Sequence, residues 1–415
     1  MQSKSQSQSQ SLSGPSVPVK RRVVALFCGF EPLNAAAQRD RFQRTASQTA
    51  TAWNCTIETG PLEGPAGEPH LDIKASGPNW RTDTRLFLFE HSALIADMRA
   101  QPLPQQIVGG FAAFVTAITQ GALFGYFRWA WRFALFFLFP FLLTAAALCI
   151  AATLAMLPWL LGLSSLHFLW SLPAGFAFFR WLFMPWSERL HTILLFANWR
   201  MALRMTMLND DAANARLENF AAGLRKALEE PADEYLIASH SMGTNFAVHT
   251  FGMLLENEPD ILAGKRIVFV TLGGALLQCS LMRSAKILRR RARLILGAPQ
   301  VEWIEVQCLT DPVHFYKSPV AAATGNSDLP AAKIIRLHVK RMLLREHYRR
   351  IRRDFLRVHR QYVMGADMRA PYDFGLIVAG PLPASNITEY YDHQMPPLGD
   401  DGSLILQSTT DGRSI

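Results

Sequence analysis

The sequence predicts an α/β protein: a mostly parallel sheet flanked by helices, with an inserted transmembrane helical hairpin. Short apolar and β-branched segments alternate along the chain with longer segments of helical periodicity, which is typical of a parallel sheet with helices on both faces. One stretch without charged residues, from Phe133 to Phe179, interrupts this alternation. It is too long and too apolar to be one more helix of the same kind, and it indicates the hairpin.

The elements follow one another in a regular order. The first strand, residues 22–28, ends in a Gly-Phe-Glu-Pro loop. The other predicted strands cover 71–75, 85–90, 234–238, 266–272 and 303–309, and the predicted helices cover 34–53, 191–208, 212–228, 244–255 and 282–296. We therefore expect one α/β unit in two parts, residues 20–102 and 191–395, with a membrane insertion over 103–190.

Both ends of the chain are polar. The first sixteen residues are a low-complexity Gln/Ser sequence without the apolar core of a secretory signal, so we predict a disordered tail over 1–19. A flexible tail is expected over 396–415 as well.

The stretch without charges spans 47 positions, from 133 to 179. One membrane helix needs about 20 apolar residues, so the stretch predicts two spans, near 133–157 and 166–183, joined by a turn at 158–165. Arginine and tryptophan residues flank both open ends, which places both termini in the cytoplasm. Residues 103–131 are interpreted as an interfacial amphipathic helix. The alternative is a pair of very apolar core helices.

The composition excludes several kinds of site. The five cysteines show no CxxC pair and no Cys/His ligand spacing, so neither structural zinc nor a disulfide framework is predicted. No phosphate-binding loop or metal-ligand set is present, and we expect no cofactor. Nine basic and two acidic residues lie between Lys340 and Arg360, without the aromatic platform of a nucleic-acid site. This segment fits anionic headgroups or a solvated helix face.

The chemical centre is predicted at Ser239-His240-Ser241-Met242-Gly243, which follows a strand and opens a helix. A tight strand-to-helix turn with small flanking residues lifts the middle serine above the sheet edge. Ser241 is therefore the candidate nucleophile, and the N–H of Met242 can bind a developing oxyanion. A serine that only caps the helix is the alternative.

An acid and a base are expected further along the chain. Asp311 follows the strand at 303–309 and is the candidate acid, an Asp-Pro turn being the alternative. Among the later histidines, His314 is too close to Asp311 and His338 lies in a strand-like run. The residues themselves leave His347, His359 and His393 open as the base.

These motifs resemble the α/β-hydrolase-fold serine hydrolases. The early Gly-Phe-Glu-Pro loop and the stretch from Asp354 to Tyr362 also resemble uncharacterised bacterial membrane-anchored hydrolase-like proteins, over roughly residues 20–100 and 190–385. The resemblance implies a Ser241 nucleophile, an Asp311 acid, a His359 base, and oxyanion donors at Phe30 and Met242.

Two residues depart from the pattern of these hydrolases. Ser239 stands where a glycine usually begins the elbow, and Cys28 where a histidine often precedes the glycine of the oxyanion loop. The oxyanion hole is thus less well defined by the sequence than the nucleophile.

The expected function is that of a serine hydrolase in the bacterial inner membrane, which cleaves an ester or thioester, including a lipid-derived one, through an acyl-enzyme. The alternative is a catalytically inactive scaffold of the same fold. The expected partners are the bilayer and an acyl substrate, not nucleic acid. Because parallel strands end at one edge, Glu90 and Ser241 are expected to exit together, so that the hairpin either seats the catalytic mouth at the bilayer or only anchors the chain.

Overall fold

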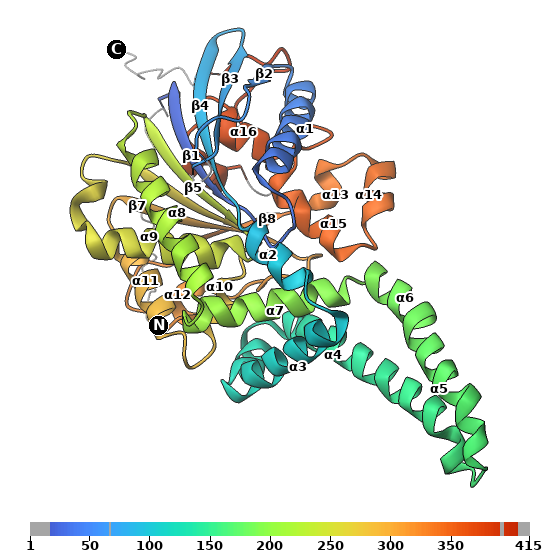
Figure 1. Cartoon of the computed structure of the whole chain (residues 1–415). Helices are drawn as coiled ribbons and strands as arrows, with labels where there is room; N and C mark the ends of the chain where they lie inside the picture. The colour runs from blue at the N-terminus through green and yellow to red at the C-terminus, as the bar shows by residue number, and fades with distance from the viewer. Residues whose placement is uncertain (1–16, 66–67, 391–393, 406–415) are drawn as a thin grey trace, which may run out of the picture.

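An eight-stranded sheet forms the centre of the protein, in the order β2-β3-β4-β1-β5-β6-β7-β8 (Figure 1). The computed structural model describes residues 17–65, 68–390 and 394–405. The strands are β1 Arg21–Phe27, β2 Thr56–Thr59, β3 His70–Gly77, β4 Trp80–Phe89, β5 Glu234–His240, β6 Ile267–Leu272, β7 Val301–Cys308 and β8 Lys333–Leu337. The six strands from β4 to β8 in this order are parallel, whereas β3 runs antiparallel to both β2 and β4.

The predicted mostly parallel α/β architecture is confirmed, with one strand that was not predicted. Strand β2 has the sequence TIET and pairs with β3. It is short and half-exposed, so it carries no run of buried apolar residues that would have indicated a strand.

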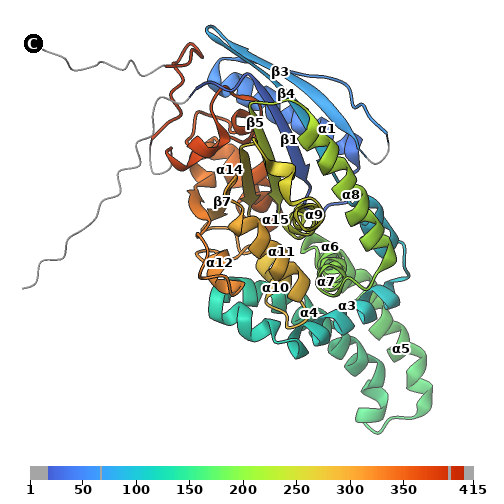
Figure 2. The same cartoon turned by 90° about the vertical axis from the view of Figure 1, so that its left-hand side faces the viewer.

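Helices cover both faces of the sheet (Figures 1 and 2). They are α1 Ala35–Trp53, α2 Ser92–Arg99, α3 Leu103–Thr119, α4 Ala122–Leu160, α5 Phe168–Ala177, α6 Met184–Arg189, α7 Thr192–Met207, α8 Asp211–Glu229, α9 Gly243–Asn257, α10 Leu276–Ser280, α11 Lys286–Gly297, α12 Val320–Ala323, α13 Val339–Met342, α14 Arg345–Ile351, α15 Phe355–His359 and α16 Phe374–Ala379. Short 3-10 or π segments are η1 Ser165–His167, η2 Phe178–Phe183, η3 Pro259–Leu262, η4 Arg360–Val363 and η5 Ala384–Thr388.

The central strands are buried on both faces, which is why they are continuously apolar. In β1, Val23 and Phe27 join the core that contains α8, α9 and α11, whereas Val24 and Leu26 join the core that contains α1 and α16. Because successive side chains of a strand point to opposite faces of the sheet, alternate residues of the same strand belong to two different cores.

One helix of the described residues, α4, is long and apolar enough to cross a membrane. Its first part is not free to do so. Phe133, Phe137 and Phe141 are buried, and they pack against Phe196 and Trp199 of α7. The predicted span at 133–157 thus includes residues that the protein itself buries. Other apolar side chains of this helix are exposed, among them Leu135 at 49% and Leu142 at 60%.

The predicted interfacial helix over 103–131 is in fact two segments. Helix α3 ends at Thr119, and α4 begins after Gly121, which has a left-handed φ of 85°. Both segments pack inward, because Ala113, Ala117 and Tyr126 are buried in the core.

After α4 the chain turns and runs back along it as a second leg, which is helical in three consecutive pieces, α5, η2 and α6. Small residues allow the two legs to approach closely: a Cβ on Gly175 would lie 2.5 Å from the carbonyl oxygen of Ala151, and the hydroxyl of Ser171 donates to the carbonyl of Ala155 at 2.8 Å. Such contacts are typical of helices that pack in lipid. The paired legs project away from the body in both views (Figures 1 and 2).

The predicted tails are shorter than expected where the structure describes them. At the amino end, residues 1–16 lie outside the described residues, but Val19 is buried and its N–H donates to the carbonyl of Pro381. At the other end, residues 406–415 lie outside them, whereas Leu398 and Leu404 are buried and form a β-bridge. The predicted flexible tail from 396 is thus packed as far as 404.

A buried ion pair ties the C-terminal segment to the sheet. Arg22 Nε donates to Glu234 Oε2 at 2.8 Å, and both side chains are almost fully buried. The guanidinium also donates to the carbonyls of Val378, Gly380 and Leu382.

We predict that Arg22→Met lowers the free energy of unfolding by about 3–5 kcal/mol, because it leaves the Glu234 carboxylate buried without its partner. The measurement is urea unfolding of the detergent-solubilised chain, followed by tryptophan fluorescence. The exposed neighbour Arg21→Met is the control and should change stability by less than about 0.5 kcal/mol. Equal effects of the two substitutions would contradict the role of the buried pair.

Candidate active site

Three of the predicted site segments meet at one edge of the sheet. Strands β1, β5 and β7 are parallel, and their carboxyl ends are at Phe27, His240 and Cys308. The loop with Phe30, the bend with Ser241 and the segment with Asp311 follow these ends directly. The crevice outside the carboxyl ends of such strands is where open α/β sheets bind ligands.

The predicted strand, bend and helix around Ser241 are present as β5 and α9. Ser241 has a φ of 54°, in the left-handed region that a residue with a Cβ rarely adopts. Its N–H donates to the carbonyl of Leu272, and its carbonyl accepts from the N–H groups of Thr244 and Ala275, all at 3.1 Å. Ser241 is half-buried between two buried neighbours. The bend thus turns the middle residue outward.

Glycine is required next to the bend because the backbone of β1 lies against it. A Cβ on Gly243 would lie 2.4 Å from the carbonyl oxygens of both Phe27 and Cys28. The small residue that the elbow pattern demands at this position therefore has a direct steric cause.

His359 and Asp311 are paired, although 48 positions separate them. His359 Nδ1 lies 2.7 Å from Asp311 Oδ2, and both side chains are buried. His359 Nε2 has no hydrogen-bond partner among the residues that the structure describes. An imidazole whose Nδ1–H donates to a carboxylate presents Nε2 as an acceptor, which is the tautomer a general base needs.

The Asp311 carboxylate is stabilised in its charged form. Burial alone would raise its pKa, but the charge of His359 and hydrogen bonds from His314 and His359 lower the pKa well below its usual range. The N–H of Val313 also donates to Asp311 Oδ1 at 2.9 Å. Asp311 therefore remains an anion near neutral pH.

The other histidines lie in different surroundings. His347 Nδ1 is 2.8 Å from Asp367 Oδ2 and is thus paired with a different carboxylate. His314 accepts at Nε2 from the N–H of Cys308, and its Nδ1 lies 3.3 Å from Asp311 Oδ2, the oxygen that also pairs with His359. His393 lies outside the described residues. Among the histidines that the structure describes, His359 alone combines a bond from one ring nitrogen to Asp311 with a second ring nitrogen that has no partner.

The two predicted oxyanion donors flank Ser241 in space. Met242 follows it in the bend, and the loop with Phe30 passes the same point: a Cβ on Gly29 would lie 3.4 Å from Ser241 Cβ and 2.6 Å from His240 Nδ1. Within the described residues, the backbone N–H groups of Phe30 and Met242 form no hydrogen bond. Both are therefore available to a ligand.

Glu31 is a positioning residue that the sequence analysis passed over. Its carboxylate pairs with Arg41 of α1 and with Arg360, the residue after His359. Burial alone would raise its pKa, but these two arginines lower the pKa to about 2. Glu31 thus ties the loop of Phe30 to the helix end that carries His359. The Gly-Phe-Glu-Pro motif was the signal for it, although the motif assigned it no partner.

His91 was also not predicted. It directly follows β4, is 1% exposed, and stacks on Phe246 of α9 with ring centroids 4.3 Å apart. Burial and the nearby Arg216 lower its pKa to about 3, so the ring is neutral. It forms part of the apolar wall behind Phe30, 6.2 Å from that ring.

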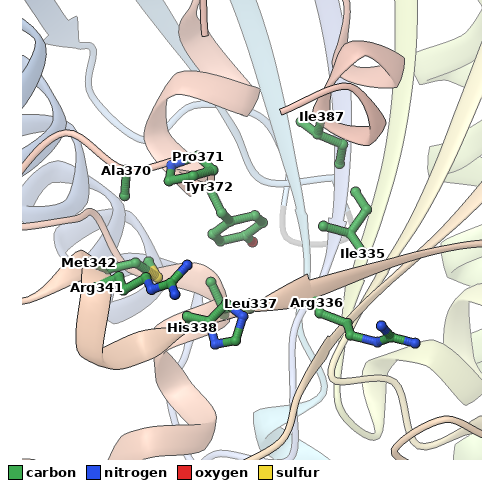
Figure 3. A pocket seen from close by; sticks show the side chains of 10 residues that line it. All are labelled: Ile335, Arg336, Leu337, His338, Arg341, Met342, Ala370, Pro371, Tyr372 and Ile387. Atoms are coloured by element: carbon green, nitrogen blue, oxygen red, sulfur yellow. The ribbon is translucent and has the colours of Figure 1, made fainter. Parts of the chain in front are cut away.

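A pocket lies at the β8 edge of the sheet, away from these residues (Figure 3). Its walls come from β8, α13 and the segment before α16, with the ring of Tyr372 at its centre and His338 at its rim (Figure 3). Ser241, Asp311 and His359 do not line it. His338 is thus associated with a separate pocket.

A second, smaller cavity lies beside the acid segment. Its lining includes Thr244 of α9, His314, and Glu305 of β7. Gln307 Nε2 donates to Glu305 Oε2 at 2.8 Å. Burial raises the pKa of Glu305 to about 7, so this carboxyl group titrates near neutrality.

Comparison of the chain with protein-family models, with curated proteins and with solved structures finds no match. The candidate site therefore rests on its own geometry.

The raised pKa of Glu305 predicts a stability that depends on pH. The folded state keeps this proton to about pH 7, whereas the unfolded state loses it near its ordinary pKa of 4.5. Stability from this group is complete below the lower value and is lost as pH rises through the upper one. We expect the free energy of unfolding to fall by on the order of 3 kcal/mol over this window.

Glu305→Gln should remove that loss, as measured by urea unfolding at a series of pH values. Glu302→Gln is the control, because Glu302 lies on the same strand but pairs with Lys333 at the surface. If Glu305→Gln and the wild type lose stability equally between the two pH values, Glu305 does not titrate as described.

Proposed function

We propose that this chain is a membrane-anchored serine hydrolase of the α/β-hydrolase type, which cleaves an ester or thioester through an acyl-enzyme. The observation that carries the proposal is the combination of a serine held at positive φ in a strand-to-helix bend with a buried His359–Asp311 pair at the same sheet edge. The chain order Ser, Asp, His agrees with that of α/β-hydrolases.

In the proposed reaction, Ser241 Oγ attacks the carbonyl carbon of the substrate while His359 Nε2 takes the hydroxyl proton. Asp311 holds the imidazole and stabilises its positive charge. The N–H groups of Phe30 and Met242 bind the negative oxygen of the tetrahedral intermediate. When the intermediate collapses, His359 returns the proton to the leaving alcohol or thiol. Water then attacks the acyl-Ser241 ester in the same way and releases the acid.

Substitutions of the proposed catalytic residues should reduce reaction with a fluorophosphonate probe and turnover of an ester. Ser241→Ala should eliminate labelling because no hydroxyl remains, and Asp311→Asn should lower kcat on a soluble ester by roughly 10⁴-fold because the imidazole loses its orientation. The measurements are in-gel fluorescence and turnover of a short-chain nitrophenyl ester by the full chain.

His347→Ala is the matched control for His359→Ala, since both histidines pair with a carboxylate. Only the change at His359 should suppress labelling. A wild-type chain that folds but is never labelled would overturn the enzyme proposal and favour an inactive scaffold of the same fold.

The membrane part of the proposal is supported by the apolar surface of the projecting legs. From Leu142, α4 continues for about 19 residues to its end at Leu160, or about 28 Å at 1.5 Å per residue, which matches the roughly 30 Å of hydrocarbon in a bilayer. The second leg is equally apolar outside: Leu166, Leu169 and Leu182 are 73%, 79% and 68% exposed. The arginines at the open ends favour a cytoplasmic location for the site and both termini.

The insertion also contacts the proposed acid segment. Phe133 of α4 lies 4.1 Å from Phe315 between ring centroids, Arg132 donates to the carbonyl of Leu309, and Ser318 donates to the carbonyl of Trp129. The helix that leads into the membrane therefore packs directly on the segment that presents Asp311. This supports a catalytic mouth that faces the bilayer surface.

We predict that placing aspartate at Leu169, Leu172 and Phe176 releases the chain from membranes. Each charge near the middle of a span costs about 2.5–3.5 kcal/mol in insertion. The measurement is the fraction of the chain left in membranes after alkaline carbonate extraction.

The control places aspartate at Ile287, Leu294 and Ile405, which are also exposed and apolar but lie away from the legs. That variant should stay in the membrane. Equal extraction of the two variants would refute the anchor. If the released variant cleaves micellar long-chain esters as fast as the wild type, the hairpin only anchors the chain.

A further inference from the structure

The basic segment between Lys340 and Arg357 lies at the base of the proposed hairpin. Phe355, at the start of α15, packs on two rings of α4, with centroids 5.5 Å from Phe136 and 5.9 Å from Phe139. It also lies 6.0 Å from His191, which follows the second leg. The start of α15 thus packs against α4 and against the residue that follows the second leg.

The contacts with α4 place the start of α15 beside an apolar part of that helix. Phe136 and Phe139 lie between Leu135 and Leu142, two apolar residues of α4 that are 49% and 60% exposed. Phe355 therefore packs beside a stretch of α4 that exposes apolar side chains and runs on into the projecting legs.

The cations of the segment that precedes Phe355 are free to bind anions. Seven exposed basic side chains form no ion pair within the part of the chain that the structure describes: Lys340, Arg341, Arg345, Arg349, Arg350, Arg352 and Arg353. The one exposed acid among them is Glu346. Elsewhere on the surface, arginines such as Arg225, Arg290 and Arg293 do pair with carboxylates.

We infer that this segment, residues 340–353, binds the headgroups of anionic phospholipids and holds the catalytic domain against the membrane surface. The inference rests on the proposed membrane anchor. Each cation near an anionic surface adds about 1 kcal/mol of attraction, or roughly fivefold in binding. The segment adds no apolar insertion of its own beyond the 56% exposed Leu344, so the attraction depends on lipid charge and on salt.

The test uses the full chain reconstituted into vesicles of phosphatidylcholine with a minor share of phosphatidylglycerol, and then excised with a nanodisc-forming polymer. The ratio of the two lipids in the purified discs is compared with the ratio in the starting vesicles. We expect several-fold enrichment of phosphatidylglycerol around the wild type, lost at high salt during reconstitution. The variant Arg345→Gln/Arg349→Gln/Arg352→Gln/Arg353→Gln should show no enrichment.

The matched control, Lys20→Gln/Arg21→Gln/Lys74→Gln/Arg81→Gln, removes the same number of exposed cations from the opposite end of the sheet and should keep the enrichment. Circular dichroism and the melting temperature verify that each variant is folded. A wild type that resists carbonate extraction but shows no enrichment refutes this inference alone, whereas a wild type that carbonate extracts refutes the anchor as well. Binding of a DNA duplex through the same arginines, without lipid enrichment, also overturns it.

Discussion

The candidate site depends on the close approach of two backbones at the carboxyl edge of the sheet. The bend after β5 packs on the end of β1 so tightly that Gly243 and Gly29 leave no space for a side chain. This contact accompanies the positive φ of Ser241 and brings the loop that contains Gly29 and Phe30 next to Ser241. The strain of the bend persists because β1, β5 and β6 are hydrogen-bonded on both sides of it. A sheet with fewer neighbours around β5 could not hold the serine outward.

The sequence predicted the parts of the fold whose local pattern agrees with their final environment. Strands β1, β5, β6 and β7 are largely buried and rich in apolar residues, and they were found within a residue or two. The sequence order Ser241, Asp311, His359 pointed to a pairing that the structure contains as a contact of 2.7 Å. The residues alone could not choose His359 over His347, because each lies near a carboxylate only after the chain has folded.

The sequence could not predict the features that arise from contacts distant in the chain. The structural role of Glu31 becomes visible only through its ion pairs with Arg41 and Arg360, which lie 10 and 329 positions away along the chain. The first predicted span includes phenylalanines that the protein itself covers, for a similar reason: a phenylalanine-rich helix has the same composition whether lipid or protein covers it. Phe137 and Phe141 are covered by α3 and α7, and no local pattern distinguishes that surface from a bilayer.

Helix α4, which is kinked at Ala130, lies in two environments, and this links the proposed anchor to the proposed chemistry. Its first part packs on Phe315 and accepts a hydrogen bond from the hydroxyl of Ser318, so it supports the segment that presents Asp311. Its last turns expose apolar side chains that only lipid or another apolar surface would cover. Phe133, which packs on Phe315, lies after the kink at Ala130 and on the part of α4 that runs into the projecting leg. In the proposed anchor, the depth of the hairpin in the bilayer would therefore also affect how the carboxyl edge faces the membrane. The segment of α14 and α15, held against the same helix through Phe355, would oppose tilting of that edge away from the surface. On this view, the position of the hairpin in the membrane also determines how a substrate would reach Ser241.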